Sequence, residues 1–265
     1  MMQRQLRSGL TISEAGFRAG ILDDTHKTLI HAAGESGRLT EVYGQLARHY
    51  TALSNRIKKL KSRLYLPALT LVIALFAHPL PSLVRSEISG FHYLQISLGR
   101  FLVIVMGVYL LVRLPGILRA LGVETSWHRL QLRVPVVANW VINREVNEFF
   151  FILAMMLEGG WAFAQALPKA VATIKNSRLR EQFVPALTMA HSGASVTKTL
   201  STVPIINATM LQVVNSSEQS GRLAAGILQL VQLNAEAISL QDDALAQWLP
   251  RLAYSIIAIW LLTLF

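Results

Sequence analysis

The chain reads LYLPALTLVIALFA from Leu64 to Ala77, a run without a single charged side chain. Leucine, isoleucine, valine and phenylalanine at the centre of a helix each favour insertion into a bilayer by roughly 0.3–0.6 kcal/mol. Pro79 and Pro81 follow the run, and proline disfavours a continuing helix. Residues 64–80 are therefore predicted to form a membrane-spanning helix. The alternative is a buried helix of a soluble core.

Two further apolar blocks, 94–114 and 248–265, are also about as long as the ~20 residues that span a hydrocarbon core. The whole chain is 52% hydrophobic and 15% charged, whereas soluble domains carry about a quarter charged residues. Arg113 and Pro115 are expected to close the first of these two blocks. The sequence thus predicts an all-α membrane protein with three transmembrane helices.

None of the three blocks has an ionisable residue at its centre. Transporters and pumps usually place such residues at mid-depth in the membrane. A polytopic transporter or channel component therefore remains only as the alternative function.

The basic residues flank a hairpin that carries little charge. Of the 25 lysines and arginines, 11 lie in residues 1–63 and 11 in residues 113–250, and the net charge is +10. Lysine and arginine accumulate in segments that stay in the cytoplasm. We expect the N-terminus and the 113–250 segment to be cytoplasmic, with the link 81–93 and the C-terminus on the far side. No apolar stretch follows the N-terminus, so no cleavable signal peptide is expected.

An internal repeat relates the two basic segments. Ser36-Gly37-Arg38-Leu39 recurs as Ser220-Gly221-Arg222-Leu223, which is an offset of 184 residues. Two more landmarks keep this offset to within one residue: Ser8-Gly9 with Ser192-Gly193, and Leu66-Pro67 with Leu249-Pro250. Three landmarks in order do not arise easily by chance, and both copies end at a membrane block.

The repeat predicts two related helical-bundle lobes on the cytoplasmic side, residues 1–63 and 115–247. The first lobe begins at the equivalent of Ser192, so it is expected to be incomplete. The second reads as six helices: Val136–Leu157, Trp161–Ile174, Ser177–His191 with Ser177 as its N-cap, Val196–Val203, Ala208–Asn215 and Arg222–Gln247. Phe149, Phe150, Phe151, Met155 and Met156 are interpreted as core residues rather than as a ligand site.

The residues of the repeated turn suit a tight connection between helices. Glycine at the end of a helix takes a positive φ readily, which favours a helix–turn–helix at Gly37 and Gly221. Ser36 and Ser220 are expected to be N-caps of the following helices.

A long amphipathic helix is predicted after the first turn. Two heptad series mark its apolar seam: Leu39, Leu46, Leu53 and Leu60, and Tyr43, Tyr50, Ile57 and Leu64. The preferred interpretation is a bundle helix, and the alternative is an intermolecular coiled coil. The other face carries the juxtamembrane basic cluster, which comprises Arg56, Lys58, Lys59, Lys61 and Arg63. Anionic lipid is its expected partner, and nucleic acid is the disfavoured alternative.

No catalytic, cofactor or metal site is predicted. The sequence lacks the phosphate-binding, nucleophile-elbow and dinucleotide-binding motifs, and it contains no cysteine. Its seven histidines are not at ligand spacings. Glu35 and Glu218 precede the repeated turns, where they are expected to bond free N–H groups of the next helix. A catalytic role for them is disfavoured, because no base or nucleophile accompanies them.

These landmarks resemble the type II secretion system F family, whose signature is a Gly-Glu-x-Ser/Thr-Gly-x-Leu turn present in two cytoplasmic domains. The first copy here is Gly34-Glu35-Ser36-Gly37-Arg38-Leu39, one residue short. The second is Ser217-Glu218-Gln219-Ser220-Gly221-Arg222-Leu223, with serine in place of the first glycine. Gly193–Leu200 and Gly9–Ala15 look like the stretches that precede the two turns.

The resemblance implies a non-enzymatic platform in the bacterial inner membrane, with a periplasmic C-terminus. It implies contacts with a cytoplasmic hexameric ATPase, other inner-membrane assembly proteins and pilin or pseudopilin, and it implies a homo-oligomer. The machine could be a type II secretion system, a type IV pilus or a conjugative thin pilus. About 50 residues of the usual first domain are absent from this sequence.

Overall fold

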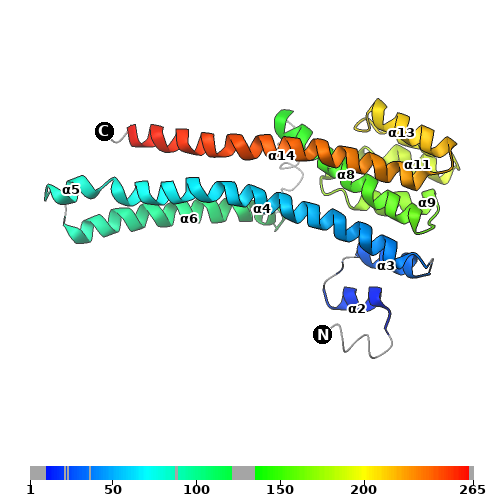
Figure 1. Ribbon diagram of the computed structural model, residues 1–265, viewed down its shortest axis with the longest axis horizontal. Coiled ribbons are helices and arrows are strands. Elements are labelled where there is room, and N and C mark those ends of the chain that lie inside the picture. The colour runs from blue at the N-terminus through cyan, green and yellow to red at the C-terminus, as the bar shows by residue number, and fades with distance from the viewer. Residues whose placement is uncertain are drawn as a thin grey trace. The chain divides into compact units, whose positions relative to one another are not determined.

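The computed structural model describes residues 10–20, 22, 24–35, 37–86, 89–120 and 135–262, and within these ranges the regular structure is entirely helical (Figure 1). The chain divides into two compact units. The first falls within Met1–Thr51 and His128–Ile238, and the second within Ala52–Trp127 and Ser239–Phe265. The predicted all-α fold is confirmed.

The first unit begins with three helices: α2 (Ile12–Arg18), α3 (Asp24–Glu35) and the start of α4 (Leu39–Ala77). Thr11 caps α2, because its hydroxyl oxygen accepts a hydrogen bond from the backbone N–H of Glu14 at 3.3 Å. Leu29 and Ile30 of α3 and Val42 of α4 are buried in the core of the first unit.

The rest of the first unit is a bundle formed by α8 (Pro135–Glu158), α9 (Phe163–Ala172), α10 (Ser177–Glu181), α11 (Val184–His191), α12 (Val196–Leu200), α13 (Ala208–Gln219) and the start of α14 (Leu223–Leu262). The single helix predicted for Ser177–His191 is wrong, because the chain turns at Gln182 and Phe183. Pro185, which has no N–H group to donate, lies in the first turn of α11. Asn176 rather than Ser177 caps α10, accepting hydrogen bonds from the N–H groups of Arg178 and Leu179.

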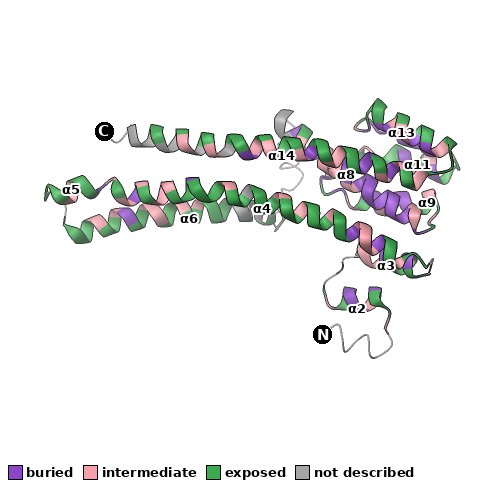
Figure 2. Ribbon diagram, in the orientation of Figure 1, coloured by how far each residue is buried: buried purple, intermediate pink, exposed green. Residues whose placement is uncertain are grey.

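One apolar core serves the whole first unit. Phe149, Phe150 and Phe151 of α8 are 0–2% exposed, and Met155 and Met156 are fully buried, which confirms their interpretation as core (Figure 2). The same core includes residues of both predicted lobes, among them Leu29, Ile30, Val42 and Leu46 from α3 and α4. Helix α8 thus packs against segments that are far apart in the sequence.

The second unit holds the membrane helices: the later part of α4, the short α5 (Leu80–Val84), α6 (Gly90–Ala120) and the later part of α14. Tyr93 of α6 donates a hydrogen bond to the carbonyl oxygen of Phe76 at 2.9 Å, and Leu75 of α4 and Ser97 of α6 are buried. α4 ends at Ala77, just before Pro79, as the sequence predicts.

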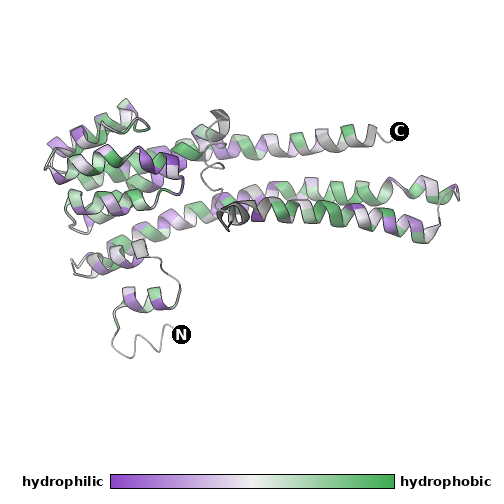
Figure 3. Ribbon diagram, turned by 180° about the vertical axis from the view of Figure 1, so that it is seen from behind, coloured by the Kyte–Doolittle hydropathy of each residue, from purple (hydrophilic) through white to green (hydrophobic). Residues whose placement is uncertain are grey.

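Among the residues that the structure describes, three helices are long and apolar enough to cross a membrane, within Leu39–Val84, Gly90–Leu110 and Leu223–Leu252. Only 6–22% of each apolar window is buried inside the protein. Figure 3 shows mostly hydrophobic residues along the visible side of α6, and Val103 of this helix is 72% exposed. A soluble core helix would bury such residues, so the membrane interpretation is supported.

Prolines within these helices do not end them. α6 continues past Arg113 and Pro115 to Ala120, so the helix extends beyond the residues that were predicted to close the apolar block. α4 likewise passes through Pro67, and α14 through Pro250. Proline removes one backbone hydrogen bond, which a membrane helix tolerates when its other bonds and its neighbours compensate.

Candidate interaction site at the repeated turn

The two repeated turns have the same backbone geometry. Gly37 has a φ of +70° and Gly221 a φ of +68°, which confirms the predicted left-handed conformation. Around Gly221, the N–H of Arg222 donates to the carbonyl of Ser217 at 3.0 Å, and the N–H of Gly221 donates to that of Glu218 at 3.1 Å. This pair of bonds is the Schellman motif, which satisfies the last carbonyl groups of a helix.

The serine of the second turn ends a helix rather than beginning one. Ser220 is the C-cap residue of α13, and its hydroxyl donates to the carbonyl oxygen of Ser217 at 3.1 Å. The predicted N-cap role of Ser220 is therefore wrong, because the Schellman turn already uses that position to close α13. Ser36 lies outside the described residues.

The carboxylate of Glu218 binds the first turn of α12. Its oxygens accept hydrogen bonds from the N–H of Val196 at 2.6 Å, the N–H of Thr197 at 2.9 Å and the hydroxyl of Thr197 at 2.6 Å. The hydroxyl oxygen of Ser195 accepts the next N–H, that of Lys198. The first three N–H groups of α12 thus all have acceptors. The prediction that Glu218 bonds the next helix is wrong, since its carboxylate reaches the preceding one.

These contacts set the charge state of Glu218. Partial burial would raise the pKa of its carboxyl group, but the hydrogen bonds from Thr197 and Val196 outweigh that effect and lower the pKa. Glu218 is therefore held ionised as a structural clamp between α12 and α13.

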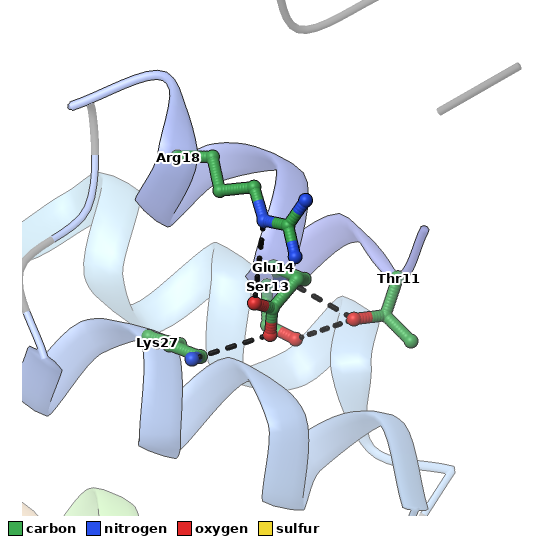
Figure 4. A network of polar contacts seen from close by, with 5 residues as sticks. All are labelled: Thr11, Ser13, Glu14, Arg18 and Lys27. Carbon is green, nitrogen blue, oxygen red and sulfur yellow. Dashed lines mark hydrogen bonds and ion pairs between the residues drawn. The ribbon is translucent and has the colours of Figure 1, made fainter. Parts of the chain in front are cut away.

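The first repeat shows a related arrangement at α2 (Figure 4). Thr11 corresponds to Ser195 and accepts the equivalent N–H, that of Glu14. Ser13 corresponds to Thr197, and its buried hydroxyl lies 3.0 Å from the hydroxyl of Thr11. Lys27 of α3 forms an ion pair with Glu14 at 3.2 Å, and this hydrogen-bonded lysine lowers the pKa of Glu14. The repeat seen in the sequence thus extends to side-chain contacts.

The remaining residues of the two turns differ in their surroundings. Arg38 donates to the carbonyl oxygen of Glu158 at 2.8 Å and to its carboxylate at 3.1 Å, so it caps the end of α8. Arg222 is exposed at the equivalent position. Leu39 and Leu223 both pack against the core. Gly34 is exposed in α3, and Glu35 is the last residue of that helix.

The juxtamembrane basic cluster faces in two directions. Lys59 forms an ion pair with Asp243 of α14 at 2.7 Å, and Arg63 donates to the backbone carbonyl of Asp243 at 3.5 Å. Lys58 and Lys61 are exposed on α4, and Arg56 is half-buried. The hydrogen-bonded Lys59 lowers the pKa of Asp243.

Lys59 and Asp243 are 184 residues apart, the same offset that relates the two turns. Equivalent positions of two related helices therefore touch each other. The contact joins α4 and α14 at matching points of the two repeats. This contact was not predicted. The repeat offset of 184 residues and the opposite charges of Lys59 and Asp243 are the sequence features that could have identified it.

A second contact was missed from the sequence. His49 of α4 stacks on Phe151 with ring centroids 3.9 Å apart, and its Nε2 lies 2.9 Å from the carboxylate of Glu148. His49 stands next to Tyr50 of the predicted seam, yet the seam alone does not identify α8 as the partner.

The described part of the chain was compared with the geometry that a bound metal ion requires. No group of three or more histidine or acidic residues there is arranged to hold a metal ion. An open hollow of about 310 Å³ beside α2 and α3 has a largely apolar lining that includes Ile12, Ile30 and Leu39. Arg38 and Glu218 of the repeated turns bond the ends of other helices.

The comparison with known families agrees with the repeat and the three apolar helices. The family described as type II secretion system (T2SS), protein F, matches residues 1–80 and 149–265. The chain belongs to this family. The resemblance inferred from the repeated turn is confirmed, and the protein is a multi-pass inner-membrane protein of the T2SS F platform family.

Two relatives are both named Type II secretion system protein F. The protein from Pseudomonas aeruginosa is 28% identical over 212 residues, which cover 72% of this chain and 52% of the relative. The protein from Vibrio cholerae is 22% identical over 242 residues, which cover 84% of this chain and 59% of the relative. This T2SS F-family chain thus spans between about half and three-fifths of the length of these relatives.

Proposed function

We propose that this T2SS F-family protein is a non-enzymatic platform that couples a cytoplasmic hexameric ATPase to the movement of pseudopilin or pilin subunits. The observation that carries the proposal is the connection from each repeated turn to the membrane. α4 runs from Leu39 to Ala77 as one helix of 39 residues, and α14 from Leu223 to Leu262 as one helix of 40 residues. At 1.5 Å per residue, each helix is about 60 Å long.

A continuous helix of this length suits the transmission of displacement. Each one begins at a turn fixed by the Schellman bonds, and Glu218 additionally ties the second turn to α12. The lobes 1–63 and 115–247 are proposed to lie in the cytoplasm, with the C-terminus in the periplasm, because their basic residues follow the positive-inside rule. Other inner-membrane assembly proteins and a second copy of the chain are proposed as further partners.

The proposal separates binding of the ATPase from transmission of its motion, and one exposed position on α4 tests the difference. Asn55→Pro removes a backbone hydrogen bond in the part of α4 that precedes the membrane, and kinks or breaks the helix there at a cost of about 3 kcal/mol or more. Asn55→Ala is the matched control, because alanine favours the helix. We expect the proline variant to insert and to co-purify with the ATPase, while export of the pseudopilin-dependent substrate fails.

The alanine variant should export its substrate at the wild-type rate. Export by the proline variant at that rate would refute transmission through α4. Failure of the wild-type chain to co-purify with the secretion ATPase of its own cell would refute the platform role itself. Nucleotide hydrolysis by the purified wild-type chain would refute the non-enzymatic assignment.

A further inference from the structure

The second unit gathers basic and aromatic side chains at one depth along its three helices. On α6, the guanidinium of Arg113 lies over the ring of Tyr109 at 5.7 Å. On α14, the guanidinium of Arg251 lies over the ring of Trp248 at 5.3 Å. On α4, the exposed Lys58 and Lys61 precede Tyr65, which is 71% exposed.

The helix pairings align these groups. Arg100 of α6 contacts His78, the residue after α4, at 3.3 Å, and the two helices run in opposite directions (Figure 1). Counted from this contact and from that of Tyr93 with Phe76, Arg113 lies opposite the stretch of α4 between residues 56 and 65, which contains Lys58 and Lys61. The ion pair of Lys59 with Asp243 places Trp248, five residues further along α14, near the same depth.

The basic cluster contains residues that contact α14 and residues that are exposed. Lys59 and Arg63, four residues apart, both reach Asp243, so their charges are engaged between α4 and α14. Lys58 and Lys61 are exposed on the same helix. Exposed cations beside exposed aromatic rings, where apolar spans begin, match the headgroup level of a bilayer.

We propose that this belt binds the headgroups of anionic phospholipids. The belt comprises Lys58, Lys61, Arg113 and Arg251 with the rings of Tyr65, Tyr109 and Trp248. The phosphate and the net negative headgroup supply the charge that complements the four cations, and the rings lie at the boundary with the acyl chains. The inference rests on the membrane location in the proposed function, but not on coupling to an ATPase.

The test measures lipid binding to the full-length chain purified in detergent. Phosphatidylglycerol and phosphatidylcholine with the same acyl chains are titrated separately, and the bound lipid is counted by native mass spectrometry. Lys58→Gln/Lys61→Gln should bind phosphatidylglycerol roughly 30-fold more weakly, from about 1 kcal/mol per charge near the membrane surface. Its binding of phosphatidylcholine should not change.

Two control variants keep the test specific. Lys175→Gln/Lys198→Gln removes the same charge from exposed lysines of the first unit and should bind phosphatidylglycerol as the wild type does. Asp243→Asn removes the partner of Lys59 without removing a cation and should also retain the lipid. An equal loss in the Lys175/Lys198 variant, or no loss in the Lys58/Lys61 variant, would overturn the proposal. Displacement of the lipid by equimolar glycerol phosphate would overturn its assignment to a bilayer surface.

Discussion

Glu218 holds the start of α12 through three hydrogen bonds, two from backbone N–H groups and one from the hydroxyl of Thr197. Glu218→Ala leaves these partly buried donors without their acceptor. Hydrogen bonds to charged groups contribute roughly 1.5–3 kcal/mol, so we expect a loss in unfolding free energy of that order. Chemical denaturation in detergent micelles measures it. Glu236→Ala, at an exposed position of α14, is the control and should change little.

The pH dependence isolates the charge of the same carboxylate. Its folded pKa is lowered, so its stabilisation is fully present above the unfolded pKa of about 4.5 and is lost as the pH falls through the folded pKa. The unfolding free energies of wild type and Glu218→Gln should therefore differ most at neutral pH and converge under acid conditions. A constant difference from pH 7 to pH 3 would contradict an ionised clamp.

Gly226 of α14 lies close against Ser217 of α13. A Cβ added there would lie 1.7 Å from the Oγ and 2.4 Å from the Cβ of Ser217, so Gly226→Ala forces the two helices apart. Overpacking of this kind usually costs about 1–3 kcal/mol, measured as a fall in unfolding free energy. Gly44→Ala in α4 is the matched control, because its Cβ meets no atom within 4 Å. It should stabilise α4 by up to about 1 kcal/mol.

Local signals predicted most of these elements. The positive φ of Gly37 and Gly221, the end of α4 before Pro79 and the burial of Phe149 each follow from one residue type in a short pattern. The wrong predictions have two causes: two local structures compete for one segment, or the contact joins residues that are far apart in the sequence. Near Pro185 a new helix begins instead of one continuous helix. Glu218 accepts hydrogen bonds from a helix that lies more than twenty residues earlier in the sequence. No short pattern specifies such a contact.

The ion pair of Lys59 with Asp243 connects α4 with α14, and exchanging its charges tests this contact. Lys59→Asp and Asp243→Lys each place like charges together, whereas the double variant restores opposite charges. Because Lys59 is half-exposed, the coupling energy should be modest and should fall at high salt. A double-mutant cycle on unfolding free energy measures it. Strictly additive single effects would exclude a pairwise interaction at this level.

For the whole molecule, the topology of the three membrane helices decides which surfaces can meet a cytoplasmic ATPase. The basic flanks predict that the lobes lie inside and that the link between α4 and α6 lies outside. The chain contains no cysteine, so single-cysteine variants can be labelled without background. Ser86 in the link and Ser192 in the bundle are both exposed and serve as matched positions.

In intact cells, a membrane-impermeant maleimide should label Ser86→Cys once the outer membrane is permeabilised, and it should label Ser192→Cys only after the inner membrane is opened. The reason is physical: moving the basic segments across the membrane would oppose both the charge bias of insertion and the membrane potential. Labelling of Ser192→Cys from the periplasmic side would place the repeated turns away from any cytoplasmic ATPase. It would remove the basis for coupling through α4 and α14, while the anionic-lipid belt would still stand on its own measurement.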